Sequence, residues 1–220
     1  MGRSLPRRPP TEVAPAGAGL EDDPADRLDA ARRRAAAAAA GLSGDEATAR
    51  AALGDADETV RAAALGALCR LGACTPANAA AALGDPSPWV RRSACELGAA
   101  LPGADVVPLL DDGDDGVVEA ACFAAGELGD PRAVPALARV AAGHGDPLCR
   151  EAAVAALGAI GDEAGLGAVL GALSDAPAIR RRAVVALAAF EGPEVDAALR
   201  ARLEDRDWQV RQAAEEILDA

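Results

Sequence analysis

Apolar and polar positions follow one pattern that recurs six times between about residue 55 and the C-terminus. Each copy has an acidic turn, an apolar anchor that is usually followed by Arg, and an Ala-rich run. The anchors lie at intervals of 30, 27, 32, 30 and 31 residues, and they are Val60, Val90, Val117, Cys149, Ile179 and Val210. A fixed period of roughly 20–50 residues is typical of solenoids, in which each unit packs only on its neighbours. The period therefore predicts a solenoid.

Each repeat is predicted to contain two helices. Positions +3, +4, +7, +8 and +11 from the anchor are mostly apolar, which is the stripe of a packed helix. Gly after the apolar runs and Pro at the turns mark the helix ends. The first helices are expected at about 44–53, 75–83, 104–110, 131–142, 162–173 and 193–203, and the second helices at about 57–71, 87–101, 115–128, 147–160, 177–190 and 207–219. No stretch alternates with a period of two, so an all-α fold is expected.

Two segments precede the repeats. Residues 1–22 are rich in Pro, Gly and charge without periodicity, which predicts a disordered N-terminal arm. Helical periodicity begins near Asp26 and continues to Gly41. Residues 23–220 are therefore expected to form the solenoid, with this helix capping its N-terminal end.

The net charge limits the choice of partner. The chain carries −13, and because its first twenty residues contribute +2, residues 21–220 carry −15. Such a field repels phosphate backbones, so no nucleic acid is expected as a partner, and a basic protein or peptide suits it better. Solubility is the plainer explanation of the same charge. All basic residues are Arg, which together with the abundant Ala and Gly indicates a GC-rich, bacterial genome.

Sequence motifs for catalysis, cofactors or metals are not found. The chain lacks G-x-S-x-G, Walker A and paired His ligands, so we expect no enzyme, catalytic residue, cofactor or metal site. The five cysteines form no C-x-x-C pair, and we expect reduced core thiols in a cytoplasmic protein. No segment is long and apolar enough to span a membrane, so no membrane partner is expected.

The repeat resembles the HEAT repeats, in the short form of the phycobilisome-lyase HEAT-like repeats. The shared pattern is Asp-x-x-x-x-Val-Arg-x-x-Ala-x-x-x-Leu-Gly-x-x-Gly, and Gly129-Asp-Pro-Arg-Ala-Val-Pro-Ala-Leu137 matches the linker and first helix. The resemblance covers about residues 44–220 and implies a right-handed α-solenoid of about six two-helix repeats. Because such arrays serve mostly as binding scaffolds, it implies no activity.

The resemblance also implies a structural ladder, in which an Asp five positions before the anchor and an Arg directly after it stack between repeats. The residues at these positions are Asp55, Arg61, Asp85, Arg91, Asp112, Arg150, Arg180, Asp205 and Arg211. Val118 departs from the Arg position, and His144 and Ser174 depart from the Asp position. Asp146 and Asp175 are alternatives for the missing carboxylates, so we expect an irregular ladder in the middle of the array.

Related enzymes fit the residues poorly. Deoxyhypusine hydroxylases need several His–Glu pairs for iron, and His144 is the one His of this chain. HEAT-like DNA glycosylases need a basic, aromatic-lined groove, which an acidic chain with 2% aromatic residues does not offer. Phycobilin lyases stay open as an alternative, although no His/Cys constellation marks pigment attachment.

The second helices line the concave face in HEAT-like arrays, and positions +2, +6 and +10 are predicted to face it. The candidate partner-binding residues are Arg92, Glu96, Glu119, Phe123, Glu127, Glu151, Arg181 and Val185. Phe123 is either an aromatic anchor for a partner or a filler of an inter-repeat gap, whereas Trp89 and Trp208 are expected to plug seams between repeats.

We therefore expect a non-catalytic scaffold or adaptor with an acidic concave groove. An enzyme-associated lyase-like or chaperone subunit, which presents a substrate or prosthetic group, is the alternative.

Overall fold

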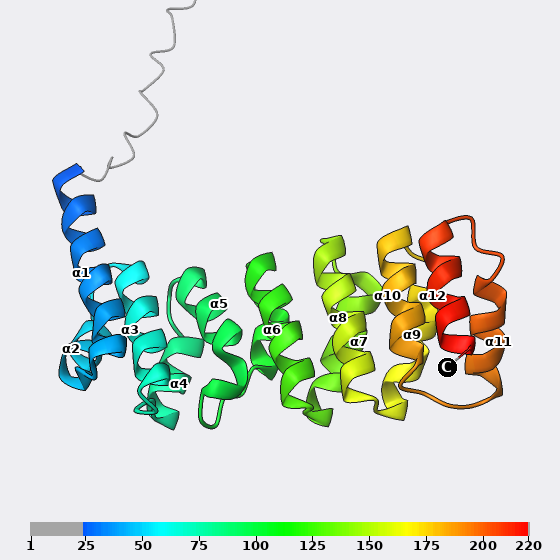
Figure 1. The fold of residues 1–220 in the computed structure, drawn as a ribbon, viewed down its shortest axis with the longest axis horizontal. Helices are drawn as coiled ribbons and strands as arrows, with labels where there is room; N and C mark the ends of the chain where they lie inside the picture. The colour runs from blue at the N-terminus through cyan, green and yellow to red at the C-terminus, as the bar shows by residue number, and fades with distance from the viewer. Residues whose placement is uncertain (1–23, 220) are drawn as a thin grey trace, which may run out of the picture.

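The computed structural model describes residues 24–219, which form an elongated array of helices (Figure 1). Within these residues there is no strand. The α-helices are α1 (Pro24–Ser43), α2 (Glu46–Ala52), α3 (Glu58–Arg70), α4 (Pro76–Leu83), α5 (Pro88–Leu97), α6 (Asp115–Leu128), α7 (Val134–Gly143), α8 (Pro147–Ile160), α9 (Leu166–Ala172), α10 (Pro177–Leu187), α11 (Pro193–Arg202) and α12 (Trp208–Leu218). Short 3-10 helices are η1 (Gly98–Ala100), η2 (Val107–Asp111), η3 (Pro131–Ala133) and η4 (Glu163–Gly165).

Consecutive helices pair into two-helix repeats. The second helices lie side by side in one row along the array, since α3 packs on α5, α5 on α6, α6 on α8, α8 on α10, and α10 on α12 (Figure 1). The first helices α2, α4, α7, α9 and α11 pack against this row. The expected all-α solenoid is therefore confirmed.

The third repeat is shorter than the sequence pattern suggested. An α-helix was expected over about 104–110, but the chain forms only the 3-10 helix η2 there, with Pro108 in its first turn. The interval between the anchors Val90 and Val117 is the shortest, at 27 residues. The missing three residues correspond to almost one helical turn, so too little chain is left for a full first helix.

Two second helices also end earlier than expected. Helix α5 stops at Leu97 rather than near residue 101, and α10 stops at Leu187 rather than near residue 190. In both places the chain continues in a tight turn. After α5, the N–H of Leu101 donates to the carbonyl of Gly98, and after α10, the N–H of Phe190 donates to the carbonyl of Leu187. The core stripe is unaffected, because Leu101 and Phe190 are still buried.

Small residues let the second helices approach one another closely. A Cβ on Gly158 of α8 would lie 2.6 Å from the Cβ of Ala186 on α10, and a Cβ on Gly126 of α6 would lie 3.0 Å from the Cα of Ala156. A contact below 3.0 Å requires the neighbouring helix to shift, and a contact of 3.0–3.4 Å is accommodated only if the neighbour moves by a few tenths of an ångström. The Gly and Ala content of the chain therefore sets the spacing of the row.

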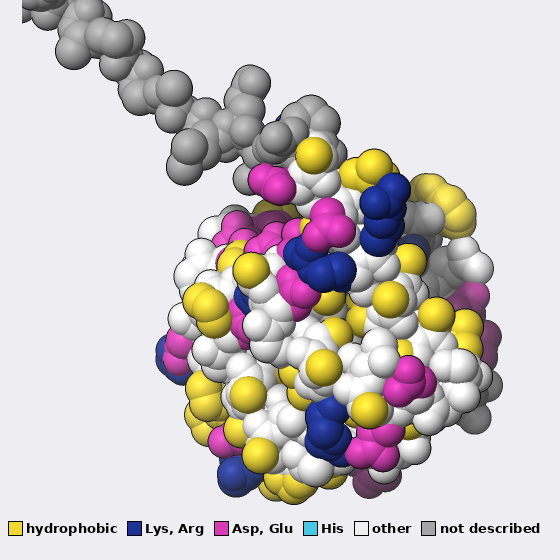
Figure 2. Space-filling view, turned by 90° about the vertical axis from the view of Figure 1, so that its left-hand side faces the viewer, with side chains coloured by type: hydrophobic (Ala, Val, Ile, Leu, Met, Phe, Trp, Pro, Cys, Tyr) yellow, Lys and Arg dark blue, Asp and Glu magenta, His cyan; other side chains and the backbone are white. Residues whose placement is uncertain are grey.

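Helix α1 takes the place that a second helix would have in a preceding repeat. It packs on α2 and α3, and it buries Ala30, Ala37 and Ala40. Figure 2 views this end of the array, where small hydrophobic side chains are scattered among polar ones and charged groups. The predicted N-terminal arm, 1–22, lies outside the described residues.

Candidate interaction surface

Five Arg–Asp ion pairs join neighbouring repeats. In each pair the Arg Nε and Nη2 atoms donate to the two oxygens of one carboxylate, at 2.7–3.1 Å. We call these pairs the Arg–Asp ladder: Arg33–Asp55, Arg61–Asp85, Arg91–Asp112, Arg150–Asp175 and Arg180–Asp205. This bidentate geometry is the strongest form of charge-assisted hydrogen bond between side chains.

Four of the five ladder pairs also hold two backbone turns, whereas the Nη1 of Arg33 contacts the carboxylate of Asp29 instead. The Arg Nη1 of Arg61, for example, donates to the carbonyl of Asp55 at 2.9 Å, and the carboxylate of Asp85 accepts the N–H of Ser87 at 2.8 Å. The guanidinium groups, followed by such backbone donors, lower the pKa values of the ladder carboxylates. The ladder therefore couples the orientation of each repeat to the next through groups that must stay ionised.

The ladder is interrupted once, between α6 and α8, and both partners are replaced together. Val118 occupies the Arg position and is buried, while His144 occupies the Asp position. The Nδ1 atom of His144 accepts the N–H of Asp146 at 3.2 Å, which is the turn bond that a ladder carboxylate makes elsewhere. The interruption thus leaves no carboxylate without an Arg partner.

The remaining departures have local explanations. Asp175 follows Ser174 and pairs with Arg150 at 2.8 Å, whereas Asp146 caps α8 through the N–H of Leu148. Arg211 donates to the carbonyl of Asp205 and meets no carboxylate within residues 24–219. Arg33 was missed by sequence reasoning, because its helix carries no anchor pattern that would mark the position.

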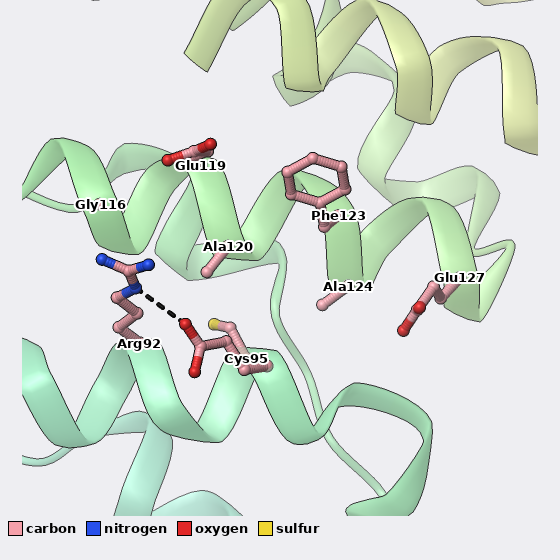
Figure 3. Close-up of a pocket in the computed structure, with 9 residues that line it drawn as sticks. Arg92, Cys95, Gly116, Glu119, Ala120, Phe123, Ala124 and Glu127 are labelled. Atoms are coloured by element: carbon pink, nitrogen blue, oxygen red, sulfur yellow. Dashed lines mark hydrogen bonds and ion pairs between the residues drawn. The ribbon is translucent and has the colours of Figure 1, made fainter. Parts of the chain in front are cut away.

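Three hollows follow one another along the row of second helices. Hollow A lies between α5 and α6 and has a volume of about 330 Å³. Its lining includes Arg92 and Glu96 from α5 and Glu119, Phe123 and Glu127 from α6. Figure 3 shows Arg92 and Cys95 on α5 and the ring of Phe123 standing on α6 between Glu119 and Glu127. The salt bridge from Arg92 to Glu96, at 2.9 Å, lies at the edge of this hollow.

Hollows B and C continue the row. Hollow B, of about 180 Å³, lies between α6 and α8 and shares Glu119 and Phe123 with hollow A. Hollow C, of about 280 Å³, lies between α10 and α12 and shares Arg182 with hollow B. The other residues of B are Leu148, Glu151, Ala152 and Ala155, and those of C are Arg181, Val185, Gln209, Gln212, Ala213 and Glu216. The shared residues make the three hollows one continuous surface.

All eight candidate partner-binding residues line one of these hollows: Arg92, Glu96, Glu119, Phe123, Glu127, Glu151, Arg181 and Val185. Phe123 is 55% exposed. Leu148, also 55% exposed, and Arg182 were missed. Arg182 occupies the +3 position of a stripe that is elsewhere apolar, and the long side chain of Arg can reach past such a stripe to solvent.

Trp89 and Trp208 do not plug seams between repeats. They are 52% and 62% exposed. Both lie in the first turn of their helices, at the N-terminal rim of the row. Side chains on a helix point back toward its N-terminus, so an indole in the first turn extends toward the end of the helix, where fewer residues cover it.

Within residues 24–219, no group of three or more His, Cys, Asp or Glu side chains could hold a metal ion. Burial raises the pKa of the Cys95 and Cys122 thiols to about 12, which keeps them protonated at neutral pH. In the same part of the chain, no helix combines the length and apolar composition that crossing a membrane requires.

Known proteins support the repeat assignment. The family model of HEAT repeats matches residues 103–184. The complex of CpcE and CpcF of phycocyanin lyase from Nostoc sp. PCC7120 is similar in fold, with a TM-score of 0.52 and 23% identity over 65% of this chain and 97% of that chain. No curated protein matches the sequence.

A designed armadillo repeat protein in complex with the peptide (KR)4 is also similar in fold. The TM-score is 0.50 and the identity is 17%, over 91% of this chain and 95% of that chain. The family model thus confirms HEAT repeats over residues 103–184, and the two solved structures show that the solenoid fold is shared.

Proposed function

We propose that this chain, whose residues 103–184 match the family model of HEAT repeats, is a non-catalytic scaffold that binds a protein partner along hollows A to C, with a basic part of the partner at hollow A. One observation carries the proposal: Phe123 is 55% exposed in the wall shared by two hollows, beside the carboxylates of Glu119 and Glu127. A large exposed aromatic side chain in a hollow is typical of an interaction hot spot. The repeat alone predicts a binding scaffold, and this observation adds a specific candidate surface to that prediction.

The carboxylates around Phe123 are available to a partner. Glu119 and Glu127 form no ion pair with another side chain of the described residues, whereas Glu96 is held by Arg92. An Arg or Lys side chain of a partner can therefore enter hollow A without breaking an existing salt bridge there. The net charge of −13 adds long-range attraction for such a segment, which raises its association rate.

Similar folds bind such peptides. The designed armadillo repeat protein of similar fold is bound to (KR)4, a peptide of alternating Lys and Arg. The likeness concerns the fold alone, but it shows that a protein of similar fold forms a complex with a basic peptide. This peptide is accordingly a suitable probe for the surface proposed here.

The test is fluorescence anisotropy of labelled (KR)4 with the full chain. Phe123→Ala and Glu119→Gln are each expected to weaken binding about tenfold, as for residues near the centre of an interface. Leu42→Ala is the matched control for Phe123, because Leu42 is exposed but lies on α1 outside the hollows. Glu204→Gln is the control for charge. Equal effects of Phe123→Ala and Leu42→Ala would show that the peptide binds elsewhere.

A lyase-associated subunit is a second candidate. It is favoured by the fold likeness to the phycocyanin lyase complex of CpcE and CpcF, whose chain is covered to 97%. In that case the hollows would hold a chaperoned substrate or prosthetic group. Absorption spectra and mass spectrometry of the protein purified from its native host test this alternative: a bound chromophore supports it, and a protein that carries only peptides or other proteins argues against it.

A further inference from the structure

We infer that hollows A, B and C recognise one extended segment whose side chains run basic, apolar and acidic in that order along the row. The inference rests on the proposed function and specifies the chemistry of the partner. Hollow A is acidic, as described above, and it accepts the basic residue. The other two hollows differ from it in their lining, and each difference points to a different side chain.

Hollow B is suited to an apolar side chain. Phe123 and Leu148, each 55% exposed, face it from α6 and α8, and Ala152 and Ala155 complete its apolar lining. Its charged groups are partly occupied, since Arg182 reaches Glu151 at 3.3 Å. An apolar side chain placed here would cover two large exposed hydrophobic groups, and Glu119 is the one charged residue of the lining without a salt bridge in the described residues.

Hollow C is suited to a carboxylate. Arg181 forms no ion pair with another side chain of the described residues, and Arg182 lies beside it. The one carboxylate in the lining, Glu216, already accepts the side-chain amide of Gln212 at 2.8 Å. Arg182 pairs with Glu151 at 3.3 Å, so Arg181 is the guanidinium of this hollow that lacks a carboxylate partner among the described residues. Arg binds carboxylates with two parallel hydrogen bonds, and Arg181 therefore gives this hollow the opposite preference to hollow A.

The spacing of the helices predicts the spacing of the recognised residues. Packed helices lie about 8–10 Å apart, and an extended chain in the polyproline II conformation advances about 3.1 Å per residue, so about three residues span one seam. This conformation has about three residues per turn, so side chains three positions apart face the same surface. Hollow B is one seam beyond hollow A. Hollow C is two further seams away, because α8 and α10 lie between. The apolar residue is therefore expected about three positions after the basic one, and the acidic residue about six positions later.

The test compares two synthetic peptides of identical composition, each with Arg, Leu and Glu in a Gly/Ser background. The first has Arg, Leu and Glu at the spacing above, and the second exchanges Leu with Glu. We expect the full chain to bind the first peptide about tenfold more tightly in fluorescence anisotropy. Equal affinities would overturn the predicted order of hollows.

Arg181→Gln separates this inference from the proposed function. It is expected to weaken binding of the Arg–Leu–Glu peptide about tenfold and to leave binding of (KR)4 unchanged or stronger, because (KR)4 has no acidic side chain. Replacing Glu by Gln in the peptide should abolish the effect of the variant. Arg206→Gln is the matched control, since Arg206 is exposed and lies outside the hollows.

The outcomes are distinct. Insensitivity of the Arg–Leu–Glu peptide to Arg181→Gln would refute the role of hollow C. Weaker binding of (KR)4 to the Phe123→Ala variant would still support the proposed function. Binding of (KR)4 that is unchanged in both Phe123→Ala and Glu119→Gln would refute it.

Discussion

The interruption of the Arg–Asp ladder suggests a transplant experiment. Val118 and His144 replace an ion pair in the middle of the array, whereas Arg180 and Asp205 form its most buried pair, with each side chain only 5% exposed. We consider the variants Arg180→Val, Asp205→His and the double variant. The double variant reproduces the combination of Val118 and His144, which the chain already contains at the ladder position between α6 and α8.

The expected loss in the free energy of unfolding depends on which charged group each variant leaves without its partner. Arg180→Val leaves the buried carboxylate of Asp205 with only the longer contact to Arg202, at 3.5 Å, and Asp205→His leaves the buried guanidinium of Arg180 without its carboxylate. Breaking a buried ion pair from one side costs about 3–5 kcal/mol, and we take about 3 kcal/mol for each variant because the pair also contacts backbone carbonyls and N–H groups. Independent effects would thus sum to about 6 kcal/mol in the double variant.

The double variant is expected to lose less than either single variant, about 1–2 kcal/mol, since replacing both members of a buried pair by uncharged groups is often close to neutral. Its His can accept the N–H of Asp207, which Asp205 accepts at 2.9 Å. The free energy of unfolding is measured by urea denaturation followed by far-UV circular dichroism. Arg139→Gln is the control, because its pair with Asp111 is exposed and its loss should have no measurable effect.

Additive losses in the double variant would refute this account of the ladder. They would mean that Arg180 and Asp205 stabilise the fold separately, through their backbone contacts, rather than as a pair. A single-variant loss of less than about 1 kcal/mol would likewise show that the pair behaves as a surface salt bridge.

Two further predictions concern the spacing of the helices and the charge of the ladder. Gly158→Ala is expected to lower the free energy of unfolding by about 1–3 kcal/mol, because the added Cβ would lie 2.6 Å from that of Ala186. A Cβ on Gly66 would have its nearest neighbour 3.6 Å away, on the flexible side chain of Arg70, so Gly66→Ala is expected to raise the free energy of unfolding by up to about 1 kcal/mol. Changes of the same sign for the two variants in urea denaturation would contradict this account of the helix spacing. The ladder carboxylates have lowered pKa values in the folded state. Their contribution to the free energy of unfolding is therefore complete above about pH 5, and it is lost as the pH falls below the unfolded pKa of about 4 toward the folded pKa values. A urea midpoint that stays constant from pH 6 to pH 3 would contradict the acid sensitivity.

The helices were largely predictable because their signals are local. The apolar stripe, the Gly and Pro breakers and the acidic caps lie within a few residues of the helix that they shape, and α6 and α8 have the predicted ends. The third repeat shows the limit of this reasoning. Its pattern resembled that of the other repeats, but the shorter interval before Val117 left room only for η2.

The candidate surface was predictable in outline. Periodicity placed Phe123 and Glu119 on one face of α6, and the structure puts both in the wall of hollows A and B. Leu148 was not predicted because it precedes the anchor Cys149, at the start of α8. Arg182 escaped notice because its position belongs to the stripe that is elsewhere buried.

The sequence by itself determined the period, the helical class and the faces of the helices, since each depends on spacing along one chain segment. Only the tertiary structure decided which residues of different repeats meet. Arg33 joins the ladder through Asp55, Asp175 serves Arg150 in place of Ser174, and Arg182 connects two hollows. These contacts depend on the distance and rotation between neighbouring helices, which the close packing of Gly and Ala sets and which no single repeat contains.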